Sequence, residues 1–290
     1  MHASLAVAAA HDRYLRNPAL TRRSLAEIYH WSRCATLFNQ KLSSPIKEED
    51  RDVLWATATY LGIVCFASDI ASPHEAWPLK PVNEPADLEW LRMSSGKAAI
   101  WRLTNPLRES SVFHPMASVY SQLYAPMPSS RGGAKVVPPI LRRLCNIDSA
   151  STAENNPYYT AVQALARLAE GPREGASLFF ALAFIAHIRN DFVALLGKKE
   201  PVALFLLSLW YAEASRAVWW IERRAEVEGR AICLYLERYH WDNDTLMELL
   251  PWKSVRFENT YTPKASDFLW GIEMLEQPTS PLFLVGFPEI

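Results

Sequence analysis

The chain has 290 residues, of which 50% are hydrophobic and 12% aromatic, and its formal net charge at pH 7 is -1. That length allows one large domain or two small ones with a substantial core. The balanced charge lacks the basic excess of a nucleic-acid surface, so no direct nucleic-acid binding is expected.

The four cysteines, Cys34, Cys65, Cys145 and Cys233, are far apart and no two have metal-ligand spacing. We interpret them as reduced core thiols of an intracellular protein, and we expect no metal and no cofactor. The apolar runs at 1–10 and 202–209 are too short to span a membrane, and the first lacks the basic leader of a signal peptide.

Apolar side chains recur at helical spacing along most of the chain, and no run alternates with the period of two that a strand requires. In chain order, helices are expected at 2–15, 22–42, 47–68, 87–103, 116–123, 140–147, 158–168, 175–196, 201–239 and 245–250. Proline-rich loops at 72–86, 105–115 and 126–139 join them, and the tail from 252 to 290 is irregular. The sequence therefore predicts a single all-α domain, an irregular multi-helix bundle.

Two of these helices carry more specific expectations. In the helix at 22–42, Thr21 is the expected N-cap. Its expected buried face comprises Leu25, Ile28, Tyr29, Ser32, Ala35, Leu37 and Phe38. The helix at 201–239 is apolar on all sides over its first two turns, so it must be covered nearly all round. We place it at the centre of the bundle.

Two polar pairs interrupt apolar helices. His187 and Asp191 are four residues apart and would share one helical face. They are either an acid/base pair at the end of an apolar cavity or an ordinary helix surface in contact with water. Glu213 and Arg216 are either a structural ion pair or the polar end of a ligand site.

The densest aromatic set lies on the helices expected at 175–196 and 201–239, and it is either plain core or the wall of a hydrophobic small-molecule pocket. The candidate ligand-binding residues are Phe180, Phe184, Trp210, Tyr211, Glu213 and Trp219. The common catalytic motifs G-x-S-x-G, H-E-x-x-H, C-x-x-C and a glycine-rich phosphate loop are absent, which weakens the expectation of an enzyme but leaves it open.

Three stretches, at 25–68, 74–103 and 201–237, together resemble the C-terminal regulatory region of fungal zinc-cluster transcription factors of the sterol uptake control protein type. The most specific part is HEAWPLKP followed by DLEWLRMSSGKAAIWRL. The resemblance implies an all-α domain that binds a sterol or terpenoid, dimerises, and controls nuclear entry and activation through ligand occupancy. The six-cysteine zinc cluster and basic linker of that family are absent from this sequence, which favours a fragment or a stand-alone protein.

Three functional hypotheses follow. The first is a ligand-sensing regulatory domain that binds a hydrophobic small molecule, present in nucleus and cytoplasm if it belongs to a transcription factor. The second is a stand-alone enzyme of fungal secondary metabolism, a cyclase, isomerase or pericyclic catalyst without a cofactor, in which His187 and Asp191 would be catalytic. The third is a protein-interaction domain with a filled core.

Overall fold

A computed structural model describes residues 1–16, 22–67, 70, 72–82, 84, 87–123, 137–170 and 177–252. These residues form twelve α-helices and three short 3-10 helices, with no strand among them. The predicted all-α class is confirmed. Most of the loop predicted at 126–139 and the tail predicted at 252–290, except for Trp252, lie outside the described residues.

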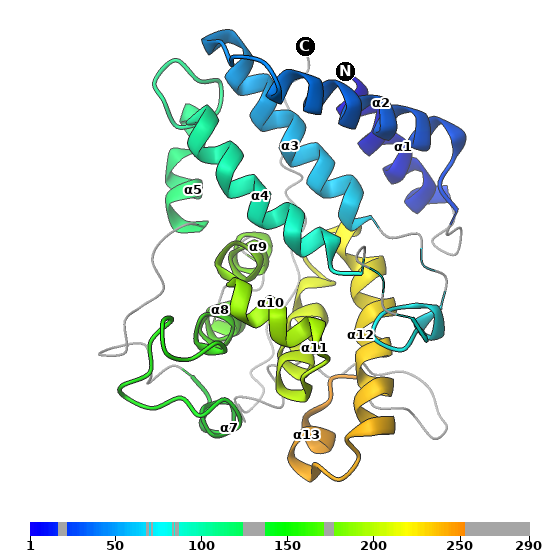
Figure 1. Ribbon diagram of the computed structural model, residues 1–290, viewed down its shortest axis with the longest axis vertical. Coiled ribbons are helices and arrows are strands. Elements are labelled where there is room, and N and C mark those ends of the chain that lie inside the picture. Colours follow the sequence, from blue (N-terminus) through cyan, green and yellow to red (C-terminus); the bar gives the residue numbers. More distant parts are fainter. Residues whose placement is uncertain are drawn as a thin grey trace, which may run out of the picture.

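The α-helices are α1 (His2–Arg16), α2 (Leu25–Leu42), α3 (Arg51–Phe66), α4 (Glu89–Thr104), α5 (Ala117–Leu123), α7 (Pro139–Leu144), α8 (Tyr159–Glu170), α9 (Ser177–His187), α10 (Asn190–Gly197), α11 (Pro201–Ala214), α12 (Trp219–Tyr239) and α13 (Asp244–Leu249). The 3-10 helices are η1 (Glu48–Asp50), η2 (Pro73–Glu75) and η3 (His114–Met116). Helices α1, α2 and α3 pack together at one end of the molecule, and α4 lies along α3 (Figure 1). Helix α11 lies in the other half, in contact with α8, α9, α10 and α12.

Helix α11 is the apolar centre that the sequence predicts. It begins at Pro201, and the Glu200 side chain accepts hydrogen bonds from the backbone N–H groups of Val202 and Ala203 at 3.2 and 2.7 Å. These bonds satisfy donors that a helix start leaves free. Residues 203–212 are all buried, as an all-round apolar helix requires.

The prediction of one continuous helix from 201 to 239 is wrong, because the helical structure is interrupted between α11 and α12. Ser215 Oγ donates to the carbonyl of Ala212 at 3.1 Å, a local bond that competes with helix continuation. Val218 is fully extended, and its β-branched side chain is a poor helix former. The break lets α12 fold back against α11 as a separate helix.

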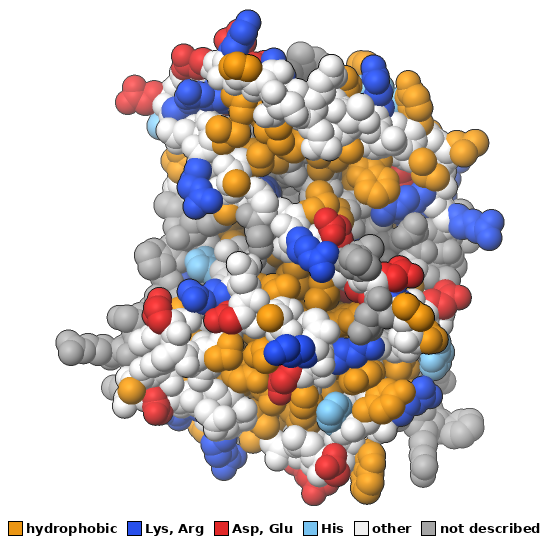
Figure 2. Space-filling view, viewed as in Figure 1, with side chains coloured by type: hydrophobic (Ala, Val, Ile, Leu, Met, Phe, Trp, Pro, Cys, Tyr) orange, Lys and Arg blue, Asp and Glu red, His pale blue; other side chains and the backbone are white. Residues whose placement is uncertain are grey.

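The predicted buried face of α2 is also largely wrong. Leu25 and Tyr29 are 87% and 60% exposed, and Ile28 and Leu37 are exposed as well. The helix instead turns Glu27 and Cys34 inward, because a charged network and not an apolar stripe fixes its orientation. Ser24 caps its start by accepting from the N–H of Glu27 at 3.1 Å, whereas Thr21 lies outside the described residues. Figure 2 shows hydrophobic side chains on the surface at this end of the molecule.

Three arginines from three different segments reach the C-terminal end of α3. Arg13 Nη2 lies 3.4 Å from the carbonyl oxygen of Ala67. Arg23 Nη2 lies 3.5 and 3.4 Å from the carbonyls of Val64 and Ala67. Arg224 of α12 donates to the carbonyls of Phe66 and Cys65 at 3.1 and 3.0 Å. Helix ends leave their last carbonyls unpaired and carry partial negative charge, so guanidinium groups suit this position.

Two buried glutamates balance these arginines. Glu27 is fully buried and accepts two hydrogen bonds from Arg13, at 2.9 and 3.0 Å. Glu228 is ion-paired with Arg224 and accepts a 2.5 Å hydrogen bond from the Tyr211 hydroxyl. A buried charge is tolerated only when it is paired and hydrogen-bonded, and these carboxylates meet both conditions.

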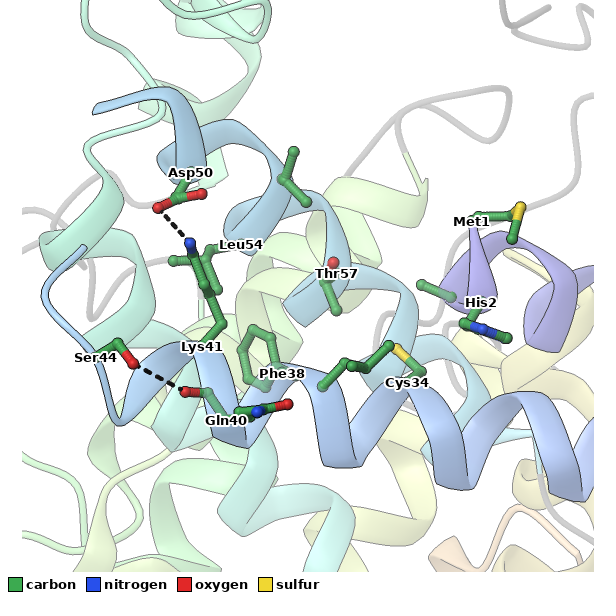
Figure 3. A pocket seen from close by; sticks show the side chains of 13 residues that line it. Met1, His2, Cys34, Phe38, Gln40, Lys41, Ser44, Asp50, Leu54 and Thr57 are labelled. Atoms are coloured by element: carbon green, nitrogen blue, oxygen red, sulfur yellow. Dashed lines mark hydrogen bonds and ion pairs between the residues drawn. The ribbon is translucent and has the colours of Figure 1, made fainter. Parts of the chain in front are cut away.

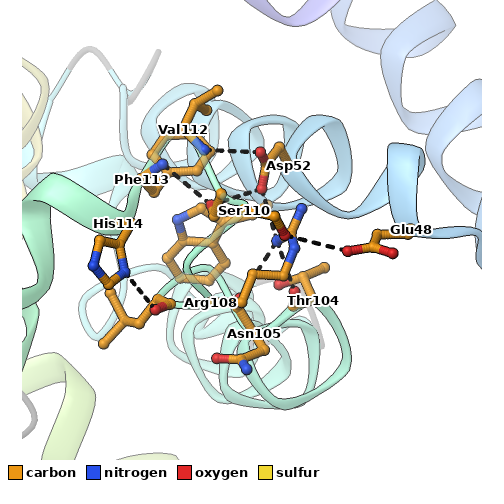
Figure 4. A network of polar contacts seen from close by, with 12 residues as sticks. Glu48, Asp52, Thr104, Asn105, Arg108, Ser110, Val112, Phe113 and His114 are labelled. Carbon is orange, nitrogen blue, oxygen red and sulfur yellow. Dashed lines mark hydrogen bonds and ion pairs between the residues drawn. The ribbon is translucent and has the colours of Figure 1, made fainter.

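At the opposite end of α3, Asp52 holds the connector that follows α4 (Figure 4). Its carboxylate accepts from Ser111 Oγ at 2.7 Å and from the Val112 N–H at 3.0 Å, and it pairs with Arg108 at 2.8 Å. Burial alone would raise the pKa of Asp52, but these hydrogen bonds outweigh it and lower the pKa below its usual value. The proline-containing connector is therefore fastened to the helix bundle.

We expect Arg224→Met to lower the free energy of unfolding by roughly 3–5 kcal/mol, because it leaves Glu228 buried and unpaired. Arg230→Met, in the same helix but at an exposed position, is the matched control and should change it by less than about 0.5 kcal/mol. Urea unfolding followed by far-UV circular dichroism measures both. Equal stabilities of the two variants would contradict a structural role for the buried pair.

Gly229 of α12 marks a close approach between segments. A Cβ at this position would lie well inside van der Waals contact of the Trp252 ring, whereas a Cβ at Gly96 of α4 would meet nothing. Gly229→Ala should therefore cost roughly 1–3 kcal/mol through overpacking. Gly96→Ala should stabilise the protein by about 0.5–1 kcal/mol through helix propensity. Melting curves of the two variants should shift in opposite directions.

Candidate functional site

A groove of about 670 Å³ lies among the start of α1, the second half of α2 and the first half of α3 (Figure 3). Its lining residues are Met1, His2, Ala3, Cys34, Leu37, Phe38, Gln40, Lys41, Ser44, Asp50, Val53, Leu54 and Thr57. Seven of these thirteen side chains are apolar, and the groove is partly open to solvent.

The groove follows from two matching helical stripes. On α2, the lining includes positions 34, 37, 38 and 41, and the lining from η1 and α3 occupies positions 50, 53, 54 and 57. Both sets follow the spacing i, i+3, i+4, i+7, which places their members on one helical face. Because the chain reverses direction between α2 and α3, the C-terminal end of the first stripe meets the N-terminal end of the second. Lys41 and Asp50, the charged members, therefore lie together at one end.

That end is held by a close ion pair. Lys41 Nζ lies 2.7 Å from Asp50 Oδ2, which also accepts from the N–H of Lys47 at 3.3 Å. The hydrogen bond from Lys41 lowers the pKa of Asp50, so the carboxylate stays ionised at neutral pH. Beyond this pair the walls become apolar, with Phe38 and Leu54 next in line (Figure 3).

The other end carries His2, whose Nδ1 lies 2.8 Å from Nδ1 of His30. One of these two nitrogens must accept the hydrogen bond, so at least one ring is neutral. Burial, together with the positive charges of His30 and Arg33, lowers the pKa of His2. Burial also raises the pKa of Cys34, so its thiol stays protonated and acts as part of the apolar wall.

Three of the predicted aromatic residues, Phe184, Trp210 and Tyr211, come together inside the core and away from this groove. Trp210 is sandwiched between Phe184 and Trp90, with ring centroids at 5.2 and 5.7 Å and interplanar angles of 11° and 12°. Trp210, Phe184 and Tyr211 have no exposed surface, and the Trp210 indole donates to the carbonyl of Ala181 at 2.9 Å. These three side chains pack against one another in the core, with Trp210 in contact with both of the others.

The remaining predicted ligand residues are dispersed. Trp219 packs on α1, with ring centroids 4.7 Å from His11 and 5.6 Å from Tyr14, and Phe180 belongs to α9 with its side chain outside the described residues. Glu213 and Arg216 do not form the predicted ion pair. Because α11 ends at Ala214, Arg216 is exposed on the turn, while one Glu213 carboxylate oxygen is buried and has no hydrogen-bond partner among the described residues.

His187 and Asp191 do not share a helical face, which corrects the sequence interpretation. Helix α9 ends at His187, Arg189 is extended, and α10 begins at Asn190. His187 Nδ1 bonds to the carbonyl of Ala183 at 2.9 Å, while Asp191 accepts from the Phe192 N–H and lies 3.5 Å from Arg189. An acidic residue in the first turn of α10 suits a helix start. His187 therefore forms its hydrogen bond at the C-terminal end of α9, and Asp191 forms its hydrogen bond at the N-terminal end of α10.

Among the described residues, no three His, Cys, Asp or Glu side chains gather as a metal site requires, and no described helix is long and apolar enough to cross a membrane. No protein-family model, curated protein or solved structure matches the chain. The resemblance to the fungal transcription factors therefore stays a prediction. The groove was missed because its two stripes belong to different helices, and only their pairing makes a site.

Tyr14 of α1 donates a 2.6 Å hydrogen bond to Glu222 of α12, and this bond raises the pKa of Tyr14 to about 12. Since the folded-state pKa lies above the ordinary value of 10, the stabilisation is present below pH 10 and is lost as the pH rises toward 12. Tyr14→Phe should cost about 1 kcal/mol at neutral pH. The difference in unfolding free energy between wild type and variant should vanish at high pH; a constant difference would contradict the bond.

Proposed function

We propose that the chain is a ligand-binding domain and that a hydrophobic small molecule occupies the groove formed by α1, α2 and α3. The observation that carries this proposal is the pair of apolar stripes that face each other across about 670 Å³. Small-molecule sites of proteins typically measure about 300–1,000 Å³ and combine apolar walls with a few polar groups. The groove has that composition, with its charged pair confined to one end.

The proposed role is regulatory. The N-terminal turn of α1 lines the groove, and the same helix carries Arg13 to the buried cluster at the end of α3. A ligand that contacts α1, α2 and α3 together favours the arrangement in which these helices are packed. Occupancy of the groove would thus be coupled to the position of α1 and, through Tyr14 and Glu222, to α12.

The resemblance to the fungal zinc-cluster factors agrees with this role. It supports a sterol or terpenoid as the ligand, a homodimer as the assembly, and a nuclear and cytoplasmic location for the protein. The enzyme hypothesis has less support, since its proposed acid and base, His187 and Asp191, serve separate helix ends.

We expect Thr57→Trp to fill the groove and to weaken binding of farnesol and ergosterol at least about tenfold, because a bulky ring replaces the space for a ligand. Thr36→Trp, at an exposed position of α2 outside the groove, is the matched control and should bind as wild type does. Native mass spectrometry detects the complexes, and the rise in melting temperature with ligand concentration gives the affinities.

Two outcomes would contradict the proposal. One is that neither ligand binds the wild-type protein. The other is that Thr57→Trp binds normally while Phe184→Leu, with its helicity intact, does not. The second result would place the ligand among the core aromatic side chains.

A further inference from the structure

The end of the groove that carries Lys41 and Asp50 offers an unusual combination of donors and acceptors. The Lys41 ammonium has three N–H groups, and its described partner is Asp50 Oδ2. Asp50 Oδ1 accepts no hydrogen bond from the described residues. A free donor and a free acceptor therefore lie side by side on a pair with no net charge.

A ligand headgroup at this end must satisfy both free groups. A hydroxyl donates and accepts at once, so it can accept from Lys41 Nζ and donate to Asp50 Oδ1. A carboxylate only accepts, and its charge would meet the Asp50 carboxylate. An ammonium only donates, and its charge would meet Lys41. Both ionic headgroups would also lose water on entering an apolar groove without gaining an unopposed counter-charge.

The environment of the pair strengthens this discrimination. The Asp50 side chain is 19% exposed, so its carboxylate is partly shielded from solvent, whereas the Lys41 side chain is 43% exposed. Phe38 and Leu54 adjoin it on the groove side. Charges in such a setting interact more strongly than at an open surface. The adjacent Ser44 hydroxyl is already bonded to the carbonyl of Gln40, at 3.5 Å, and adds no counter-charge.

We propose that Lys41 and Asp50 determine headgroup specificity in this groove: they select an uncharged amphiphile with a hydroxyl and reject acids and amines of the same chain length. This inference rests on the proposed function, because it assigns the polar end of the same ligand. It adds that the ion pair determines selectivity for the charge of the ligand headgroup, whereas the apolar stripes determine selectivity for the shape of its apolar part.

The test compares decanol, decanoate and decylamine, which share one chain and differ in headgroup charge. At neutral pH the wild-type protein should bind decanol about tenfold more tightly than either ionic compound, measured by isothermal titration calorimetry. Asp50→Asn leaves the Lys41 charge unopposed and should turn the preference toward decanoate. Lys41→Met leaves Asp50 unopposed and should turn it toward decylamine.

Glu49→Gln is the matched control, since Glu49 is an exposed neighbour of Asp50 that does not line the groove. It should keep the wild-type order of affinities. Circular dichroism confirms that each variant is folded. Wild-type preference for decanoate or decylamine, or an unchanged order in both pair variants, would overturn the headgroup assignment while leaving the groove as a ligand site. Failure of all three compounds to bind would overturn the headgroup assignment, and it would overturn the proposed function itself only if farnesol and ergosterol also failed to bind.

Discussion

The structure depends on the neutralisation of the C-terminal end of α3. Four successive carbonyl groups there, from Val64 to Ala67, are within reach of arginines that come from before α2, from α1 and from α12. The arginines in turn require Glu27 and Glu228, because guanidinium groups at a buried site need counter-charges. Helices that are far apart in sequence are thus joined by one set of buried charges. Removing one member of the set would leave its partner buried without a counter-charge.

This constraint also explains where the groove lies. The arginine cluster holds the N-terminal end of α2 against the C-terminal end of α3, and Lys41 with Asp50 holds the opposite ends of the same two helices. Between these two ends most of the facing residues are apolar, and the groove lies among them. Helix α1 is anchored near its C-terminal end by Arg13, while its first residues line the groove. Anchor and site therefore occupy different ends of one helix.

The sequence was sufficient for the class of fold and for most of the helices, because apolar periodicity reports burial directly. It did not predict the breaks at 188–189 and 215–218, where polar or β-branched residues act together with the packing of neighbouring helices. It grouped Phe184, Trp210 and Tyr211 correctly, but whether aromatic rings enclose a cavity or stack on one another depends on sub-ångström placement. The buried orientation of α2 was unpredictable for a different reason: Glu27 overrides the apolar stripe.

The same limit applies to the groove. Each stripe has helical spacing within its own segment of the sequence, at 34, 37, 38 and 41 and at 50, 53, 54 and 57. The site exists only because the two helices are paired in one register, which nothing local specifies. The Lys41–Asp50 pair is the exception, a local feature that indicates this register. Opposite charges on either side of a short connection between two helices favour the register in which they meet.

The bond between Arg224 and the carbonyl of Phe66 joins residues 158 positions apart in the chain. During synthesis, the first three helices emerge long before the residue that completes the end of α3. Until α12 is available, the carbonyls of Cys65 and Phe66 must rely on water. The N-terminal layer should therefore assemble late and cooperatively, as is typical of contacts with a high sequence separation. A chain that ends before α12 would leave this layer open to proteases, even though every residue of the groove is present.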